Sequence, residues 1–356
     1  GASALLGVAD ALTLAGTDGA GLLEIPAGSN GRGLREAGVL PNAGPGLAEP
    51  ASIGRATHEI AAGLAAGELN AVYLLHSDPL RDLPDRPAWE LALERASTVI
   101  AHASFLTESI RAHASVVFPA ESYAEKEGTI THPDGRIQRL RPAVSHVGST
   151  RAEWQVLAEL AQRLGLDLGI LAGPLATAQL VDAIPFYGGL TLDELAGHGV
   201  RWQERAQAAA YPAAGGATTA GSSSDAPAAT REPAGSAPGG GASATPAAPD
   251  ADRALATDGA LRLGTFRSIW ASPEVEVSPA LKFLAARQQL EISPHDAERL
   301  GLRQGERVQV GSNGHRVHAT VALRDAVRAG SVFLQEGTPE ENVNLLVEQL
   351  VEVRPA

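Results

Sequence analysis

The chain has 356 residues and a formal net charge of −13, with 44% hydrophobic but only 4% aromatic residues. This acidic balance argues against nonspecific nucleic-acid binding, which needs a surplus of Lys and Arg to neutralise phosphates. The chain holds no Cys, so it supplies no disulfide, no zinc thiolate and no cysteine ligand for an iron–sulfur cluster. It also lacks Met, and no apolar run approaches the ~20 residues that span a bilayer. We therefore expect a segment of a longer protein without a membrane-spanning helix.

Three short apolar runs predict an open α/β sheet in the first half of the chain. They occupy residues 71–75, 98–103 and 115–120 and are typical of strands that are buried on both faces. The segments between them have helical patterns, and helical crossovers join parallel strands. We therefore predict an open parallel sheet with helices packed against it.

In such sheets, ligands bind in the loops beyond the carboxyl ends of the strands. Two loops have this position here, at residues 76–79 and 120–128. The second loop contains Glu121, Glu125 and Glu127. From the sequence, this acidic cluster is either solvated charge or part of a ligand-binding loop, and both interpretations stay open.

A helix is expected at residues 150–164. Thr150 and Glu153 have the spacing of a capping box, and Gly165 has the position of a terminating residue. Apolar side chains recur at helical spacing and predict a face packed in a core, namely Trp154, Leu157, Leu160 and Leu164.

Residues 206–258 consist mainly of Ala, Gly, Ser, Thr and Pro. Such a composition buries too little apolar surface to offset the entropy lost on ordering, so we predict a flexible linker. After it, Ser293 and Pro294 indicate the start of a short helix that ends at Gly301. Alternating segments around Asn313-Gly314 indicate a hairpin, and several short strands together predict a compact barrel.

No complete catalytic set is present. The sequence has no nucleophile elbow, no phosphate-binding P-loop and no pair of His residues at zinc-protease spacing. None of its ten His has metal-ligand spacing with another His or a carboxylate. We therefore predict no catalytic and no metal-binding residues in this chain.

The segment 115–138 resembles the signature of the molybdopterin oxidoreductases. In this signature an apolar strand ends in Pro-Ala, here Pro119-Ala120, and a Glu-x-x-Gly-Thr element and a Gly-Arg-x-Gln element follow. These elements correspond to 125–129 and 135–138. The loop at 76–79, which reads His-Ser-Asp-Pro, is similar to a Gly-x-Asn-Pro loop of the family but departs from it at the cofactor contacts.

The segment 259–356 resembles the dinucleotide-binding module of the same family, a double-psi β-barrel. The resemblance implies a fold of an open parallel molybdopterin-oxidoreductase sheet followed by that barrel. It also implies candidate cofactor-binding residues for the nucleotide end of a pterin, if a pterin is retained, namely Thr265, Arg267, Ser312 and Asn344.

The stretch 28–46 is more similar to the cluster-bearing peripheral-arm subunit of the NADH-quinone oxidoreductases (complex I) than to the catalytic reductases. This implies a structural C-terminal segment of that subunit, with no cofactor of its own and with iron–sulfur clusters held upstream. The expected partners are other peripheral-arm subunits, at the cytoplasmic face of the plasma membrane and without insertion into it. The expected division is the tail of an upstream α/β domain, a molybdopterin-oxidoreductase-like domain, the linker and the barrel, at 1–50, 51–205, 206–258 and 259–356.

The alternative is a fragment of a molybdenum bis-pterin oxidoreductase of the formate dehydrogenase or nitrate reductase type. In that case the barrel would hold molybdopterin guanine dinucleotide. Either way, we expect part of an oxidoreductase without a complete active site in this chain.

Overall fold

The computed structural model describes residues 2–22, 25–26, 28–212, 259–339 and 341–356. The predicted linker lies outside the described residues from residue 213 to its end. In the described part, no helix is long and apolar enough to cross a membrane.

The chain divides into two compact units, each built from segments that are far apart in the sequence. Unit 1 comprises residues 1–60 and 118–216, and unit 2 comprises residues 61–117 and 217–356. Unit 2 thus joins the predicted sheet to the predicted barrel. The expected domain boundaries follow the sequence order and do not coincide with this division, and they stay a prediction.

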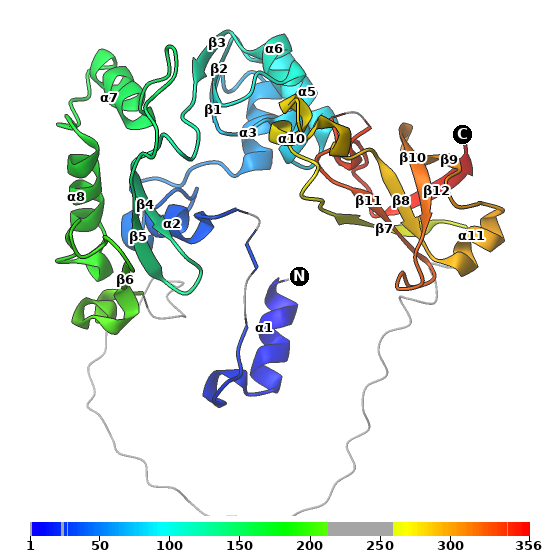
Figure 1. Ribbon diagram of the computed structural model, residues 1–356, viewed down its shortest axis with the longest axis horizontal. Coiled ribbons are helices and arrows are strands. Elements are labelled where there is room, and N and C mark those ends of the chain that lie inside the picture. Colours follow the sequence, from blue (N-terminus) through cyan, green and yellow to red (C-terminus); the bar gives the residue numbers. More distant parts are fainter. Residues whose placement is uncertain (1, 23–24, 27, 213–258, 340) are drawn as a thin grey trace, which may run out of the picture. The chain divides into compact units, whose positions relative to one another are not determined.

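Unit 2 contains a three-stranded sheet of order β1-β2-β3. Strands β1 (Ala71–Leu75) and β2 (Thr98–Ala103) are parallel, in the register Ala71↔Thr98, and β3 (Val116–Pro119) follows β2. The predicted open sheet is therefore confirmed. The helices of this region are α3 (Thr57–Ala65), α4 (Pro79–Asp82), α5 (Arg86–Arg95) and α6 (Glu108–His113). Figure 1 shows α3, α5 and α6 beside the sheet.

Local chemistry explains where two of these helices begin. The carboxylate of Asp85 accepts a hydrogen bond from the amide of Ala88, and Pro87 occupies the first turn of α5, where no amide donor is needed. At α6, the hydroxyl of Thr107 accepts a hydrogen bond from the amide of Ile110. These caps satisfy backbone donors that the helices cannot pair internally.

The second part of unit 2 is a closed six-stranded barrel of order β10-β8-β11-β7-β12-β9. Its strands are β7 (Leu261–Phe266), β8 (Gln289–Ile292), β9 (Arg307–Ser312), β10 (His315–Leu323), β11 (Ser331–Gln335) and β12 (Leu350–Pro355). The pairs β8–β10 and β7–β11 are parallel, and the other pairs are antiparallel. This confirms the expected double-psi β-barrel.

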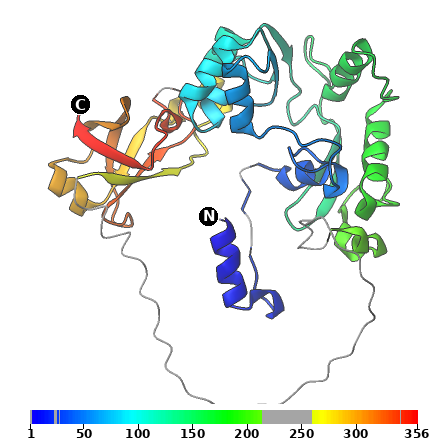
Figure 2. The ribbon, with the colours of Figure 1, turned by 180° about the vertical axis from the view of Figure 1, so that it is seen from behind.

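Short helices complete the barrel region, namely α10 (Pro273–Val277), η6 (Lys282–Leu284), α11 (Pro294–Leu300) and η7 (Val343–Leu345). Helix α11 begins and ends as predicted, because the Ser293 hydroxyl caps the amide of Asp296 and Gly301 takes a left-handed conformation with φ 69°. Figures 1 and 2 show α11 outside the barrel wall from opposite sides.

The barrel encloses an apolar core whose inward side chains alternate along each strand. Leu290, Ile292, Val308, Val310 and Leu334 are completely buried. The predicted β9–β10 hairpin is also confirmed, with Asn313 and Gly314 at φ 46° and 83° in its turn. A two-residue turn with positive φ at both positions has a backbone twist that matches the right-handed twist of the flanking strands.

Unit 1 contains an antiparallel sheet of order β4-β5-β6, formed by β4 (Gly128–Thr131), β5 (Arg136–Leu140) and β6 (Val200–Arg201). Its α-helices are α1 (Ala2–Ala11), α2 (Gly31–Glu36), α7 (Glu153–Arg163) and α8 (Gly173–Ala183). Its 3-10 helices are η1 (Leu14–Gly16), η2 (Pro45–Leu47), η3 (Pro185–Tyr187), η4 (Trp202–Glu204) and η5 (Ala206–Ala210). An aromatic cluster around Phe186, Tyr187 and Trp202 forms much of its core.

The expected linker begins too early. Residues 206–210 form η5, and the ring of Tyr211 stacks on Trp202 with centroids 5.1 Å apart. Tyr211 also meets Phe186 edge-on at 5.0 Å. Burial of aromatic surface holds this segment on unit 1, although its composition resembles that of the residues that follow.

The helix predicted at 150–164 differs from α7 in its start and in its apolar face. It begins at Glu153, and Thr150 makes no capping bond, because the Glu121 carboxylate accepts from the Glu153 amide at 2.9 Å. The predicted core stripe is wrong for Leu157 and Leu164, which are 37% and 74% exposed, whereas Trp154 and Leu160 are partly buried. Only the side of α7 that carries Val156 is buried.

Candidate functional site

A cavity of about 810 Å³ lies in unit 2, between the end of α4 and one side of the barrel. Residues 81–85 line it from the α/β part, and the barrel contributes the end of β7 and residues 336–349. Its size falls in the ~300–1,000 Å³ range of small-molecule sites. Three of the four predicted cofactor-binding residues, Thr265, Arg267 and Asn344, line this one cavity.

The lining of this cavity is rich in carboxylates. The lining contains two basic residues, Arg81 and Arg267, and four acidic residues, Asp82, Asp85, Glu336 and Glu348. With all of them ionised, the lining has a formal net charge of −2, although burial raises the pKa of Asp82. The cavity therefore attracts cations and hydrogen-bond donors more than it attracts anions.

Thr265 and Arg267 both hydrogen-bond to Glu336. The Thr265 hydroxyl donates to Oε1, and Arg267 Nε donates to Oε2 at 2.7 Å. Burial of Glu336 raises its pKa, but these hydrogen bonds and the charge of Arg267 outweigh burial and lower the pKa below its usual value. Glu336 is therefore ionised and pairs with the cation that the family resemblance assigned to the nucleotide end of a pterin.

Asn344 ties the barrel to helix α4. Its Nδ2 donates at 2.9 Å to the carbonyl oxygens of Leu80 and Leu83, which the short helix leaves without internal donors. Its Oδ1 is buried and accepts no hydrogen bond from the described part of the chain. Asn344 thus has a structural role through its nitrogen, and its oxygen is a buried acceptor.

Arg81 completes this attachment. Its guanidinium binds the carboxylate of Glu276 through two hydrogen bonds, of 3.0 and 2.5 Å, and donates a further one to the carbonyl of Gly337. The side chain of Asn342 donates to the Arg81 carbonyl at 2.9 Å. A bidentate guanidinium–carboxylate pair is a strong and directional contact. Hydrogen bonds and an ion pair therefore join the α/β part of unit 2 to its barrel part beside the cavity.

Ser312, the fourth predicted residue, lies elsewhere. It lines a smaller cavity of about 350 Å³ at the β9–β10 turn, together with Asn313, His315 and Arg316. The structure does not bring Ser312 to the cavity of Thr265, Arg267 and Asn344. No local pattern in the sequence separates the two groups, because the closure of the barrel decides which strand ends meet.

The acidic loop after β3 is a structural element of unit 1. Glu121 and Glu125 are 4% and 7% exposed, so the solvated-charge interpretation is wrong for these two residues. Glu121 accepts from His146 Nε2 at 2.6 Å as well as from the start of α7. Glu125 accepts from the amides of Ser122 and Val147, and the amide from Ser122 is the main cause that lowers its pKa. These carboxylates anchor loops to α7.

Glu127, the third member of the loop, accepts from the indole nitrogen of Trp154 at 3.0 Å. The neighbouring Lys126 pairs with Glu153 at 2.9 Å. In the described part of the chain, no group of three or more His, Cys, Asp or Glu residues has the arrangement of a metal site. The loop therefore stabilises α7, and its ligand-binding role stays a prediction.

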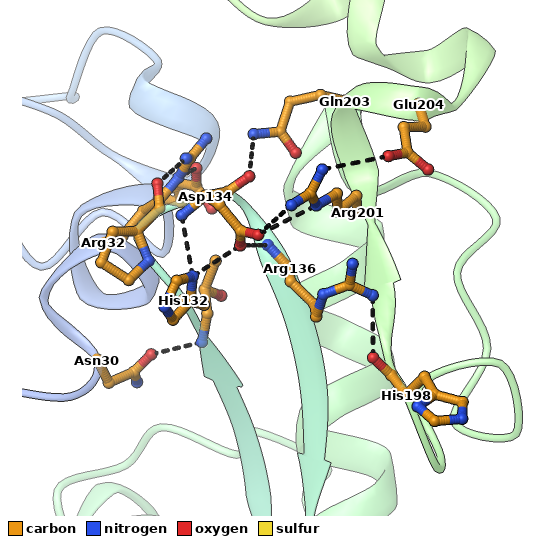
Figure 3. A network of polar contacts seen from close by, with 12 residues as sticks. Asn30, Arg32, His132, Asp134, Arg136, His198, Arg201, Gln203 and Glu204 are labelled. Carbon is orange, nitrogen blue, oxygen red and sulfur yellow. Dashed lines mark hydrogen bonds and ion pairs between the residues drawn. The ribbon is translucent and has the colours of Figure 1, made fainter. Parts of the chain in front are cut away.

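The Gly-Arg-x-Gln element at 135–138 forms the turn and start of the β4–β5 hairpin. Figure 3 shows the polar network around Asp134, whose carboxylate accepts from the Arg136 amide at 3.0 Å, from His132 Nδ1 at 2.8 Å and from Arg201 at 2.7 Å. Burial opposes the charge of Asp134, but these donors hold its pKa far below the usual range. Gly135 is at φ 84°, where glycine is favoured.

The same network joins the hairpin to the N-terminal segment of unit 1. Asn30 Oδ1 accepts from the Thr131 amide at 2.9 Å, and Arg32 donates to the Pro133 carbonyl (Figure 3). The motif that carried the family resemblance is thus a folding element that fastens three chain segments together.

The loop at 76–79 also has a structural role. Asp78 is buried, and its carboxylate accepts from the hydroxyls of Thr107 and Ser109, each at 2.6 Å. It also caps α4 through the amide of Leu80. Asp78 therefore fastens α4 to α6.

Sequence reasoning missed Glu336 and Arg81. Arg267 and Glu336 are 69 positions apart and carry no shared local pattern. The parallel pairing of β7 with β11 places them side by side, and a signal for such pairing exists only in the tertiary structure.

Comparison with known proteins gives two consistent family matches. The profile of the family described as "Molybdopterin oxidoreductase" matches residues 9–163. The profile described as "Molydopterin dinucleotide binding domain" matches residues 261–353. The second match means that a dinucleotide-binding domain is present in this chain. This corrects in part the expectation that the segment has no cofactor of its own.

Relatives with similar sequences are oxidoreductase subunits. The chain is 27% identical to the NADPH-Fe(3+) oxidoreductase subunit alpha of Geobacter sulfurreducens, over 97% of this chain and 38% of that protein. It is 26% identical to the F420-dependent formate dehydrogenase 2 subunit alpha of Methanococcus maripaludis, over 93% of this chain and 50% of that protein. The chain thus spans half or less of the length of these two relatives.

Among solved structures, acetylene hydratase from Pelobacter acetylenicus has a similar fold. The TM-score is 0.57 at 14% sequence identity, over 86% of this chain and 47% of that one. This likeness concerns the fold alone.

Proposed function

We propose that this chain, which belongs to the molybdopterin oxidoreductase family, is the structural C-terminal portion of an electron-transferring oxidoreductase subunit. The observation that supports this most directly is that the cations lining the cavity in unit 2 are paired with carboxylates. Both of the guanidinium groups in its lining are bonded to carboxylates, Arg267 to Glu336 and Arg81 to Glu276. The absence of Cys means that thiolate ligands for iron–sulfur clusters come from elsewhere in the protein.

The residues present do not fit the phosphate part of a pterin dinucleotide. Phosphate oxygens need unpaired cations or several N–H donors, and neighbouring carboxylates repel them. Here the lining carries a formal net charge of −2, and the Thr265 hydroxyl and Arg267 Nε are already bonded to Glu336. The volume suits such a ligand, but the chemistry of the lining opposes it.

In its specific form, the proposal is that the chain belongs to the cluster-bearing peripheral-arm subunit of an NADH-quinone oxidoreductase (complex I). Electrons from NADH would pass through iron–sulfur clusters held upstream, on their way to quinone. Unit 1 and unit 2 would supply shape and contacts for neighbouring subunits at the cytoplasmic face of the membrane. The resemblance at 28–46 and the carboxylate-rich cavity support this form.

A second candidate is the large subunit of a molybdenum bis-pterin oxidoreductase. The names of the relatives favour it, since they include formate dehydrogenases and an NADPH-Fe(3+) oxidoreductase. The match of residues 261–353 to a dinucleotide-binding domain also favours it.

The deciding experiment is analysis of the full-length protein, isolated from its own source, for iron, molybdenum and oxidised pterin. The structural proposal predicts several iron atoms per chain with neither molybdenum nor pterin. Stoichiometric molybdenum together with pterin would overturn it in favour of the second candidate.

A further inference from the structure

Glu336 lies beside Thr265 and Arg267, the two residues that the family resemblance assigned to a nucleotide. It follows β11, which pairs in parallel with β7 so that Gln335 lies opposite Phe266. The Glu336 amide donates to the Phe266 carbonyl at 2.9 Å, which continues this pairing. Figure 1 shows β7 and β11 next to each other in the barrel. The backbone pairing therefore places Glu336 next to β7, and its carboxylate bonds to both Thr265 and Arg267.

The contacts of this carboxylate are those that a phosphate would make. One of its oxygens accepts a hydrogen bond from a hydroxyl, and the other accepts one from a guanidinium group. Carboxylates and phosphates bind Arg with similar geometry, and both are anionic acceptors. The Arg267 and Glu336 side chains remain 65% and 32% exposed, so a ligand in the cavity has access to them.

We propose that Glu336 is an internal competitor that closes the Thr265–Arg267 site to phosphate-bearing ligands. This inference rests on the proposed structural function, since it explains how a dinucleotide-binding domain rejects the anionic part of a dinucleotide. Loss of the carboxylate charge frees Arg267 and changes the net charge of the lining from −2 to −1.

The test compares two variants that remove the same charge from the same cavity. Glu336→Gln frees Arg267 from an ionic partner, whereas Glu348→Gln leaves the Arg267–Glu336 pair in place. Glu348 also lines the cavity, but its carboxylate accepts from Asn313. Any effect of net charge alone therefore appears in both variants.

Binding of guanosine diphosphate, inorganic pyrophosphate and guanosine to the full 1–356 chain is measured by calorimetry at low and high salt. We expect E336Q to bind the diphosphate and pyrophosphate about tenfold or more tightly than the wild-type chain and E348Q, because a charge-assisted bond is gained and a repulsion is lost. Adding Arg267→Gln to E336Q should abolish the gain, and high salt should reduce it. Guanosine binding should be the same in all variants.

Equal affinities of wild type and E336Q for pyrophosphate would overturn the inference, and so would equal gains in E336Q and E348Q. If E336Q does not fold, as judged by circular dichroism, Glu336→Ser is the replacement and the same comparison applies. Tight pyrophosphate binding by the wild-type chain would overturn the inference directly. Pterin in the native full-length protein would instead overturn the structural function, so the two failures are distinguishable.

Discussion

The barrel of unit 2 and helix α7 of unit 1 place their apolar side chains in opposite ways. The barrel is a closed sheet, and residues such as Val308, Val310 and Leu334 point into it and are completely buried. Within α7, Leu157 is 37% exposed, and Leu164 directly after the helix is 74% exposed. A closed sheet fills its own interior, whereas a helix buries only the stripe that another element covers. The barrel thus completes its own core, while α7 leaves an apolar face uncovered by unit 1.

The largest expected effect tests this contrast directly. Leu334→Ala leaves a hole in the barrel core and should destabilise the chain by about 2–5 kcal/mol. Leu164→Ala changes an exposed side chain and should cost less than about 0.5 kcal/mol. Urea unfolding measures both values, and hydrogen exchange assigns the loss to barrel peptides. Similar costs for the two variants would break the comparison.

A smaller loss of stability is expected when a hydrogen-bonded carboxylate, buried or partly exposed, is replaced by an amide. Asp296 of α11 is buried in the barrel region, where its carboxylate accepts from the Ser293 hydroxyl at 2.8 Å and the Gly330 amide at 2.7 Å. Asp296→Asn should therefore cost about 2 kcal/mol. Asp134→Asn, in the partly exposed network of unit 1, should cost about 1 kcal/mol or less, because solvent screens its ion pair. Urea unfolding of the two variants beside wild type measures both costs, and a larger loss for D134N would reverse the expected order.

The Asp296 effect should depend on pH. Burial raises the pKa of Asp296, but its hydrogen-bond donors outweigh burial and lower it below the usual 3.8. A lowered folded-state pKa gives stability that is fully present above the unfolded value and is lost as pH falls through the folded value. The stability difference between wild type and D296N should therefore be constant near neutral pH and shrink below about pH 4. A difference that grows on acidification would contradict this assignment.

The smallest expected difference is between two hairpin turns. Gly135 in unit 1 and Gly314 in the barrel both have positive φ, at 84° and 83°. Gly314→Ala meets no atom within 4 Å and should cost only the backbone strain of about 1–2 kcal/mol. Gly135→Ala brings a Cβ to 1.9 Å from Gln203 Nε2, which must move and lose its bond to the Asp134 carbonyl. We expect an additional cost of about 1 kcal/mol in thermal unfolding. Equal costs would mean that Gln203 relaxes freely.

Local patterns predicted local elements well. The apolar runs at 71–75 and 98–103 are strands β1 and β2, and Asn313-Gly314 forms the turn of a hairpin. Ser293 and Gly301 bound α11 as expected. In each case the signal and the structure involve neighbouring residues, so short-range sterics and hydrogen bonding suffice.

Partners from distant segments were not predictable. Thr150 has capping-box spacing, but Glu121 caps α7 instead. The apolar stripe of α7 has helical spacing, yet the pattern does not reveal which side another element covers. For the candidate site, the family resemblance identified Thr265, Arg267 and Asn344, which do share a cavity, but it also included Ser312, which does not line it.

The sequence alone thus determined the existence of a sheet and a barrel, the turns and caps between their elements, and the absence of thiolate ligands. The tertiary structure decided which charges meet. The parallel β7–β11 pair places Glu336 on Arg267, and Asn344 caps α4 from the barrel. Hydrogen bonds and ion pairs act over a few ångströms whatever the separation along the chain, so only the folded arrangement fixes the chemistry of the cavity.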